Sequence, residues 1–235
     1  MKTVDEVSLL FNNKARSWND KYCLDGPLAF RVTVFSAILA RLIRQGAAVL
    51  DFGGGTGAIS SVLASQGYKM TACDVAEQMI LAGKRAQSDK PIDWVLLPKD
   101  WKRLPFANNT FDAIIASSVF EYLSDLENTM KECSRILKPA GKLIVSVPNL
   151  AHPLRKLERL LHPLANFGVR VPFARDLPGI GPYLVYLQLS RVRLSPEEWS
   201  EKARSVGLDP IKVQPPETES ASSKAMMYLV FDRSL

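Results

Sequence analysis

Short apolar segments alternate with amphipathic ones through the middle of the chain. Five segments are predicted to be strands: 47–52, 68–73, 92–97, 111–116 and 142–147. Three segments between them have helical spacing: 58–66, 76–87 and 128–137. Strands that alternate with helices of about ten residues are typical of βαβ units, whose parallel sheet is covered by helices on both faces. The pattern therefore predicts an α/β domain.

Residues 1–46 have a different pattern, which predicts helices without strands. Phe11, Trp18 and Tyr22 are spaced seven and four residues apart, so they share one face if the segment is helical throughout. We expect residues 1–46 to form a helical cap on a domain that spans residues 47–235.

Residues 150–193 interrupt the alternation after the fifth strand. Over 152–165, leucines recur on one helix face and basic residues on the opposite face, which predicts an amphipathic helix. The leucines are Leu154, Leu157, Leu160, Leu161 and Leu164, and the basic residues are Arg155, Lys156 and Arg159. Residues 168–182 have the composition of a loop. We expect 150–193 to be a lid insertion.

The end of the chain returns to helix and strand. Ser195 is followed by a proline and, three residues on, by Glu198, which is a capping box that begins a helix. Residues 211–213 and 226–231 are predicted to be the last two strands. A linker rich in proline and serine joins them over 215–224, with no helix between.

The composition is that of a globular protein. Of the 235 residues, 47% are apolar and 23% are charged, and the apolar runs are far shorter than the roughly 20 residues that span a bilayer. The first residues lack the apolar region of a secretory signal. Cys23, Cys73 and Cys133 form no CxxC pair, as in proteins with reduced thiols. We therefore expect a cytoplasmic protein, and its net charge of +6 allows an anionic partner.

The segment after the first predicted strand carries the strongest chemical signal. It reads Asp51-Phe52-Gly53-Gly54-Gly55-Thr56-Gly57 and leads from a strand into a helix. Glycines let the backbone turn sharply and approach a ligand, and a helix start offers free N–H groups. Asp74 ends the next strand 17 residues after Gly57, where a carboxylate can accept both hydroxyls of a ribose. A nucleotide-like ligand is expected there.

Two phosphate-binding patterns fit this loop less well. The P-loop pattern G-x-x-x-x-G-K-[ST] does not occur in the chain. In the dinucleotide pattern G-x-G-x-x-G, the last position after Gly53 and Gly55 is Ala58. Alanine is a permitted substitute, so an NAD site stays open.

Several motifs, taken in order, resemble the class I S-adenosylmethionine-dependent methyltransferases, in the small-molecule branch that includes quinone-biosynthesis enzymes. They are Asp51–Gly57, Asp74, Asp100-Trp101, Leu104–Phe106 with Phe111–Ile115, and Leu137–Leu143. The resemblance implies a Rossmann-like sheet of seven strands, mostly parallel with an antiparallel last strand, helices on both faces and a helical lid. It also implies S-adenosyl-L-methionine as cofactor and methyl transfer to a small molecule.

The resemblance assigns roles to individual residues. Those implied to contact the cofactor are Asp51, Gly53, Gly55, Gly57, Asp74, Val75, Asp100, Trp101 and Ser117. In this assignment the glycines pass beside the methionine portion, Asp74 binds the ribose, and Val75 and Asp100 contact the adenine. Displacement at a sulfonium then requires the protein to position the acceptor, exclude water and manage one proton.

Residues 117–123 follow the fourth strand and resemble the family's "EVLEH" segment, which faces the cofactor methyl. Glu121 matches the second acid, whereas Ser118 and Tyr122 replace the first acid and the histidine. Two of the three ligands found in metal-binding relatives are therefore missing, and we expect no metal, since a hard cation needs several oxygen ligands. Glu121 is a candidate general base, and His152, beyond the fifth strand, is a second catalytic candidate.

In this family the N-terminal helices and the segment after the fifth strand cover the acceptor. The residues implied to bind it are Trp18, Tyr22, Tyr122 and Arg155. Arginine binds phosphate and carboxylate groups bidentately. One hypothesis is therefore an anionic or lipid-linked acceptor under a basic lid, a location that would also allow contact with a membrane surface. The alternative is that the basic residues form a solvated outer face.

Other functions stay open at this level. A non-catalytic cofactor-binding or scaffold protein would bind the cofactor without turnover. An NAD-dependent oxidoreductase would need a hydride-transfer pair such as Tyr-x-x-x-Lys, and an amino-methyltransferase of nucleic acids an Asn-Pro-Pro-Tyr-type motif. The sequence contains neither, so a small-molecule substrate is preferred over nucleic acid. The oligomeric state is not indicated.

Overall fold

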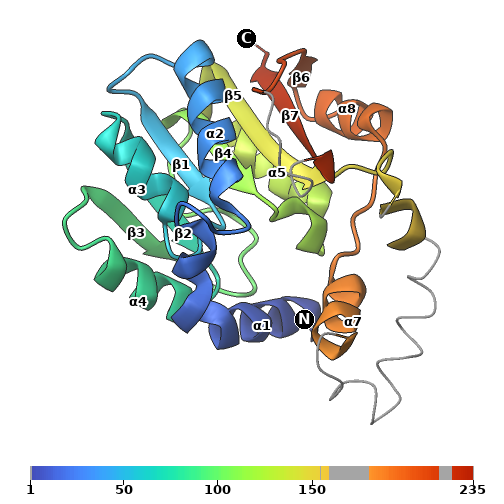
Figure 1. Cartoon of the computed structure of the whole chain (residues 1–235). Coiled ribbons are helices and arrows are strands. Elements are labelled where there is room, and N and C mark those ends of the chain that lie inside the picture. Colours follow the sequence, from blue (N-terminus) through green and yellow to red (C-terminus); the bar gives the residue numbers. More distant parts are fainter. Residues whose placement is uncertain (1, 154, 159–179, 217–223, 235) are drawn as a thin grey trace.

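The computed structural model describes residues 2–153, 155–158, 180–216 and 224–234. Its elements in chain order are α1 (Lys2–Trp18), η1 (Asn19–Tyr22), α2 (Ala29–Leu42), β1 (Ala48–Phe52), α3 (Ala58–Ser65), β2 (Lys69–Asp74), α4 (Glu77–Ala86), β3 (Ile92–Leu96), β4 (Phe111–Ser117), η2 (Phe120–Tyr122), α5 (Leu126–Ile136), β5 (Leu137–Pro148), α7 (Ile180–Leu189), α8 (Pro196–Arg204), β6 (Leu208–Ile211) and β7 (Met226–Arg233). Figure 1 shows a central sheet with helices on both sides, and α1 and α7 next to each other at one end.

The strands form one sheet in the order β3-β2-β1-β4-β5-β7-β6. Strands β1 to β5 are parallel to one another, whereas β7 is antiparallel to both β5 and β6. The predicted sheet of seven mostly parallel strands with an antiparallel last strand is therefore confirmed.

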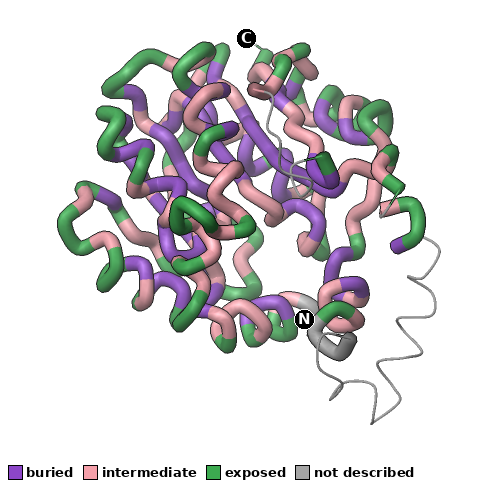
Figure 2. Tube along the Cα trace, viewed as in Figure 1, coloured by how far each residue is buried: buried purple, intermediate pink, exposed green. Residues whose placement is uncertain are grey.

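Two apolar cores lie on opposite faces of the sheet. Successive residues of a strand alternate between them: Val49 belongs to the core under α2 and α3, and Leu50 to the core under α5 and α8. Because both faces are covered, the central strands are apolar at almost every position. Figure 2 shows that burial is concentrated along these strands. Among the described residues, no helix combines the length and the apolar character needed to cross a membrane.

Strand β5 differs from the prediction because it begins at Leu137 rather than at residue 142. Phe111 pairs with Leu137 and Ala113 with Lys142, so the register shifts between them, and Ala140 has a φ of +60°. The Lys-Pro-Ala-Gly segment, expected to be a turn, is thus an irregularity within a strand. Turn-forming residues satisfy either role, since a bulge also needs unusual dihedral angles.

Two further boundaries were predicted wrongly. Strand β6 covers Leu208–Ile211 instead of 211–213, because Gly207 (φ +75°) turns the chain directly from the end of α8 into the strand. Residues 180–182, expected in a loop, belong to α7. The rest of that expected loop, 168–179, and residues 217–223 of the expected linker lie outside the described residues.

Candidate active site

A cavity of about 1190 Å³ lies at the carboxyl ends of β1, β2 and β4. The strand order reverses at this point, because the chain runs outward from β1 to β3 and then returns to the other side of β1 at β4. Such a reversal creates the crevice in which open α/β sheets bind ligands. The outer wall comes from Phe11 and Trp18 of α1 and from Tyr183 and Tyr186 of α7.

The loop after β1 has a backbone that requires its glycines. Gly53 and Gly55 have positive φ angles of +70° and +57°, and a Cβ on Gly53 would lie 2.5 Å from Cγ2 of Val119. Gly57, in contrast, is not among the residues that line the cavity. A Cβ on Gly57 would lie 2.5 Å from Cη2 of Trp94, so this glycine makes room for a tryptophan at the start of α3.

Asp74 ends β2 at the cavity wall, and the backbone holds both of its carboxylate oxygens. Oδ2 accepts a hydrogen bond from the N–H of Gly55 (2.9 Å), and Oδ1 accepts one from the N–H of Ala76 (2.8 Å). Burial raises the pKa of Asp74, and these hydrogen bonds oppose the rise. Each carboxylate oxygen has two lone pairs. These two hydrogen bonds do not use every lone pair, so the carboxylate can also accept from hydroxyls of a ligand in the cavity.

Asp51 lies at the buried end of β1, beneath the glycine loop. Its Oδ2 accepts a hydrogen bond from Oγ of Ser60 (2.7 Å), and its Cγ is 2.9 Å from the position of a Cβ on Gly54. Burial raises the pKa of Asp51 to about 7, and the neighbouring Asp74 adds to the effect. A carboxyl this close to the cavity is stabilised in its charged form by a cation bound nearby.

Val75, Asp100 and Trp101 line the part of the cavity beside β2 and β3. Val75 follows β2, and the other two follow β3. The Trp101 ring packs edge-on against Phe52, with centroids 6.0 Å apart. Asp100 is exposed. A flat heterocycle bound here would meet apolar surface on its face and a carboxylate at its edge.

Arg31 of α2 is a cavity residue that the sequence analysis missed. Its Nη1 donates to Oγ of Ser117 at the end of β4 (3.3 Å), and its buried Nε has no partner among the described groups. Burial raises the pKa of Tyr22, which also faces the cavity, while Arg31 and Ser117 oppose the rise. Arg31 forms no ion pair within the described part of the chain, so its charge is available to a ligand anion.

Glu121 lines the cavity although only 2% of its surface is exposed. Its Oε2 has no hydrogen-bond partner among the described residues. Burial raises the pKa of Glu121 to about 7, against the opposing charges of Arg31 and Arg155. Burial also raises the pKa of the adjacent Tyr122 well above its usual value. Glu121 therefore has the protonation equilibrium of a general base near neutral pH.

An aromatic wall borders Glu121 on the side of α1 and α7. The ring of Tyr122 makes an edge contact with Phe11 (5.5 Å between centroids) and another with Tyr186 (6.4 Å). Phe11 in turn contacts Trp18 edge-on (5.4 Å), and Nζ of Lys21 lies 4.3 Å from the Trp18 ring centroid. This wall suits a flat, largely apolar ligand.

Comparisons with known proteins agree with this geometry. Residues 50–145 match the family described as "Methyltransferase domain". The demethylmenaquinone methyltransferase of Paenarthrobacter aurescens is 32% identical over 164 residues, which are 68% of this chain and 61% of that protein. The ubiquinone/menaquinone biosynthesis C-methyltransferase UbiE of Cereibacter sphaeroides is 37% identical over 108 residues, which are 43% of this chain and 42% of that protein.

The chain contains a class I S-adenosylmethionine-dependent methyltransferase domain. The match to this chain spans about three fifths of the length of the first curated relative and about two fifths of the second. Among solved structures, the fold is similar to 1,6-didemethyltoxoflavin-N1-methyltransferase of Burkholderia thailandensis, with a TM-score of 0.65 and 16% identity, covering 98% of this chain and 88% of that one. A likeness at this identity shows the fold of the methyltransferase domain.

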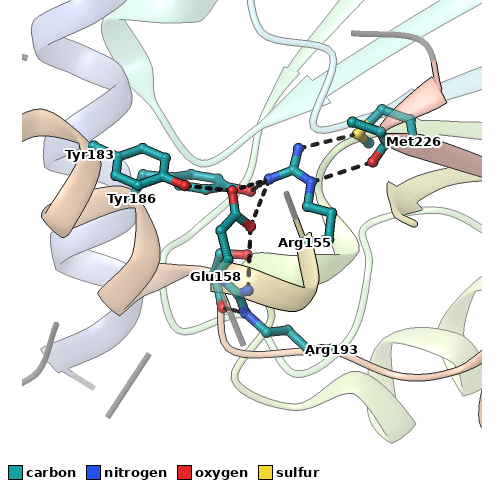
Figure 3. Close-up of polar contacts among 8 residues, drawn as sticks. Arg155, Glu158, Tyr183, Tyr186, Arg193 and Met226 are labelled. Carbon is teal, nitrogen blue, oxygen red and sulfur yellow. Dashed lines mark hydrogen bonds and ion pairs between the residues drawn. The ribbon is translucent and has the colours of Figure 1, made fainter. Parts of the chain in front are cut away.

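The described part of the segment expected to cover the acceptor turns charged side chains toward the cavity. Arg155, predicted to bind the acceptor, lines the cavity together with Glu158, which is 1% exposed. The two residues form an ion pair (Figure 3). Leu157, one of the leucines predicted on the opposite helix face from Arg155, is 51% exposed. Leu154, Arg159 and the later leucines lie outside the described residues.

His152 precedes this helical turn and is not among the residues that line the cavity. Its backbone N–H donates to the carbonyl of Asn149 (3.0 Å), as in a turn. The described residues contain no group of three or more His, Cys, Asp or Glu side chains arranged to hold a metal ion. Of the two catalytic candidates, Glu121 is the one whose side chain borders the cavity.

Proposed function

We propose that this protein transfers the methyl group of S-adenosylmethionine to a hydroxylated ring compound of the quinol type that carries a lipid chain. The observation that carries the proposal is a single cavity with two unlike ends: Asp74 and the glycine loop at one end, and Glu121 within an aromatic wall at the other. Relatives whose names specify demethylmenaquinone support a quinol as the acceptor.

The donor end fits S-adenosylmethionine group by group. Gly53 and Gly55, with positive φ, carry the backbone past the place of the methionine portion, and Arg31 beside Ser117 offers an unpaired charge to its carboxylate. The remaining lone pairs of Asp74 suit the ribose hydroxyls, and Val75, Asp100 and Trp101 border the place of the adenine. The bound cofactor supplies an electrophilic methyl group on a sulfonium. Asp51 adds negative charge beneath the loop, which favours that cation.

Tyr122 and Arg155 border the acceptor end. Of the other two residues predicted to bind the acceptor, Trp18 lies beside the glycine loop, with Nε1 3.4 Å from the position of a Cβ on Gly55, and Tyr22 lies beside Arg31 and Ser117. We propose that Tyr122 and Arg155 hold the acceptor ring against the methyl group and keep water away. The proton of the acceptor hydroxyl moves to Oε2 of Glu121, and its electron pair remains on the acceptor. The acceptor then forms a bond to the methyl carbon while the carbon–sulfur bond breaks with its electron pair on sulfur.

Two titrations and one turnover assay test this function. Calorimetry with S-adenosylmethionine and with NAD shows which cofactor binds, and we expect only the first to bind. Turnover is measured by mass spectrometry after incubation with S-adenosylmethionine and a short-chain demethylmenaquinol. We expect an adduct that is one methyl group heavier. Binding of NAD alone overturns the proposal, and cofactor binding without product supports a non-catalytic cofactor-binding protein instead.

A further inference from the structure

A polar cluster borders the cavity, and Figure 3 shows its contacts. Glu158 is its centre: Nη1 of Arg155 donates to both carboxylate oxygens (2.7 and 2.8 Å), and the hydroxyl of Tyr183 donates to Oε1 (2.8 Å). Arg193 approaches Oε2 from the other side (3.4 Å). Nη1 of Arg155 also donates to the hydroxyl of Tyr186 (2.8 Å). The cluster thus joins residues 155–158 to residues 183–193, which follow about 25 residues later in the sequence.

Two of the three guanidinium nitrogens of Arg155 donate hydrogen bonds to oxygen atoms, and the third does not. Its Nε donates to the carbonyl of Ala225 (3.3 Å), and Nη1 is occupied by Glu158 and Tyr186. Among the described residues, the partner of Nη2 is the thioether sulfur of Met226 at 3.9 Å. A thioether is a weak acceptor. Arg155 lines the cavity, and Nη2 is the guanidinium nitrogen with the weakest partner among the described residues.

The charges of the cluster do not cancel. Two guanidiniums, Arg155 and Arg193, face one carboxylate, Glu158, and their side chains are 13%, 8% and 1% exposed. Glu121 also interacts electrostatically with Arg155, but it forms no ion pair with Arg155 or Arg193 among the described residues. An uncompensated charge in a buried position is costly, and a ligand of opposite charge relieves that cost.

We infer that the acceptor end is an oxyanion subsite, in which Nη2 of Arg155 binds an ionised oxygen on the acceptor ring. This inference rests on the proposed function, and it names the acceptor class: quinols, phenols, naphthols and enols, whose ring oxygen is an anion once the hydroxyl proton has left. The two neighbouring cations, Arg155 and Lys156, then have separate roles. Arg155 faces inward to the ligand, whereas the exposed Lys156 next to it faces solvent.

The test uses 4-nitro-1-naphthol, whose ionised form absorbs visible light, bound to the protein in the presence of S-adenosylhomocysteine. A pH titration of the absorbance gives the pKa of the bound probe. We expect this pKa to lie at least about one pH unit below that of the free probe, which is a tenfold preference for the anion. The methyl ether of the probe, which cannot ionise, should bind at least about tenfold more weakly above that pKa.

Three variants separate the subsite from general charge. Arg155→Met should abolish the lowered probe pKa. Lys156→Met, which removes an equal charge from the next residue, should leave the probe pKa unchanged. Glu158→Gln removes the counter-charge and should keep the probe pKa low or lower it further. Arg155→Met should instead raise the probe pKa relative to the wild type. Circular dichroism and binding of S-adenosylhomocysteine show that each variant is folded.

The inference is overturned if the probe does not bind, if it binds in its neutral form, or if Arg155→Met retains the anion preference. A raised probe pKa in a folded Glu158→Gln variant also contradicts it, and this arm decides the matter if Arg155→Met fails to fold. The titration requires no methyl transfer. A lowered probe pKa without turnover would support the subsite and contradict the proposed function. Turnover without a lowered probe pKa would support the proposed function and contradict the subsite.

Discussion

One substitution, Glu121→Gln, tests activity and stability together. Burial raises the pKa of this carboxyl from 4.5 to about 7. Between these values the folded protein binds more protons than the unfolded chain, so its stability falls as the pH rises from about 4.5 to about 7 and is constant above. A difference of about 2.5 pH units, at about 1.4 kcal/mol each, amounts to about 3 kcal/mol. Glutamine has nearly the same shape and no charge, so it avoids this cost.

We expect Glu121→Gln to be more stable than the wild type at pH 8 and about equally stable at pH 5. For a chain of this size, about 3 kcal/mol corresponds to a rise in the melting temperature of roughly 6 to 12 °C. Loss of a general base should lower kcat by about 10²- to 10⁴-fold. Scanning calorimetry at both pH values and the pH profile of kcat/KM measure these effects. The wild-type profile should rise through about pH 7, and the variant should lack that limb.

Glu132→Gln is the matched control. Glu132 accepts hydrogen bonds from Nη2 of Arg135 (2.6 Å) and from the N–H of Leu104 (2.7 Å), and its pKa is lowered chiefly by Arg135. The same substitution should therefore lower the melting temperature at pH 8. The argument is refuted if Glu121→Gln melts no higher than the wild type at pH 8, or if the variant keeps the acidic limb of the activity profile.

Three further predictions concern the cofactor end and the fold. Asp74→Ala should weaken S-adenosylmethionine binding at least tenfold, by about 1.4 kcal/mol or more, in a calorimetric titration; an unchanged Kd would count against the ribose contact. Gly57→Ala should cost about 1 to 3 kcal/mol of unfolding free energy in urea, and more than Gly67→Ala, because both glycines have positive φ but only Gly57 abuts Trp94. Equal losses would show that Trp94 moves aside. Ser195→Ala, which removes the cap bonded to the N–H of Glu198, should cost about 1 kcal/mol in the same urea experiment.

The order of elements could be predicted because it depends on local patterns. Strands buried on both faces must be apolar throughout, and glycine at the ends of helices needs only its own backbone freedom. The capping box at Ser195 was predicted and is present, because its two hydrogen bonds join residues three apart in sequence. The β5 irregularity was missed, since the same residues are compatible with a turn and with a bulge.

The two ends of the site differ in how far the sequence could predict them. The glycine loop and Asp74 lie on one βαβ unit, so their spacing alone indicates that they meet, as the hydrogen bond from Gly55 to Asp74 shows. Arg31 gave no signal, because an isolated arginine on a helix is indistinguishable from a solvated one. Its role depends on Ser117, which is 86 residues away.

The sequence by itself determined the order of strands and helices and the pairing of the glycine loop with Asp74, because each depends on local patterns or on neighbours within one strand–helix unit. Only the tertiary structure decided the orientation of Arg155 and the buried charge of Glu158. Helical periodicity identifies two faces but not the one that is buried, and a buried ion pair reverses the usual assignment. The buried face is the one that meets Tyr186 of α7 and Arg193, which follows α7. Tyr186 accepts a hydrogen bond from Arg155, and Arg193 donates one to Glu158.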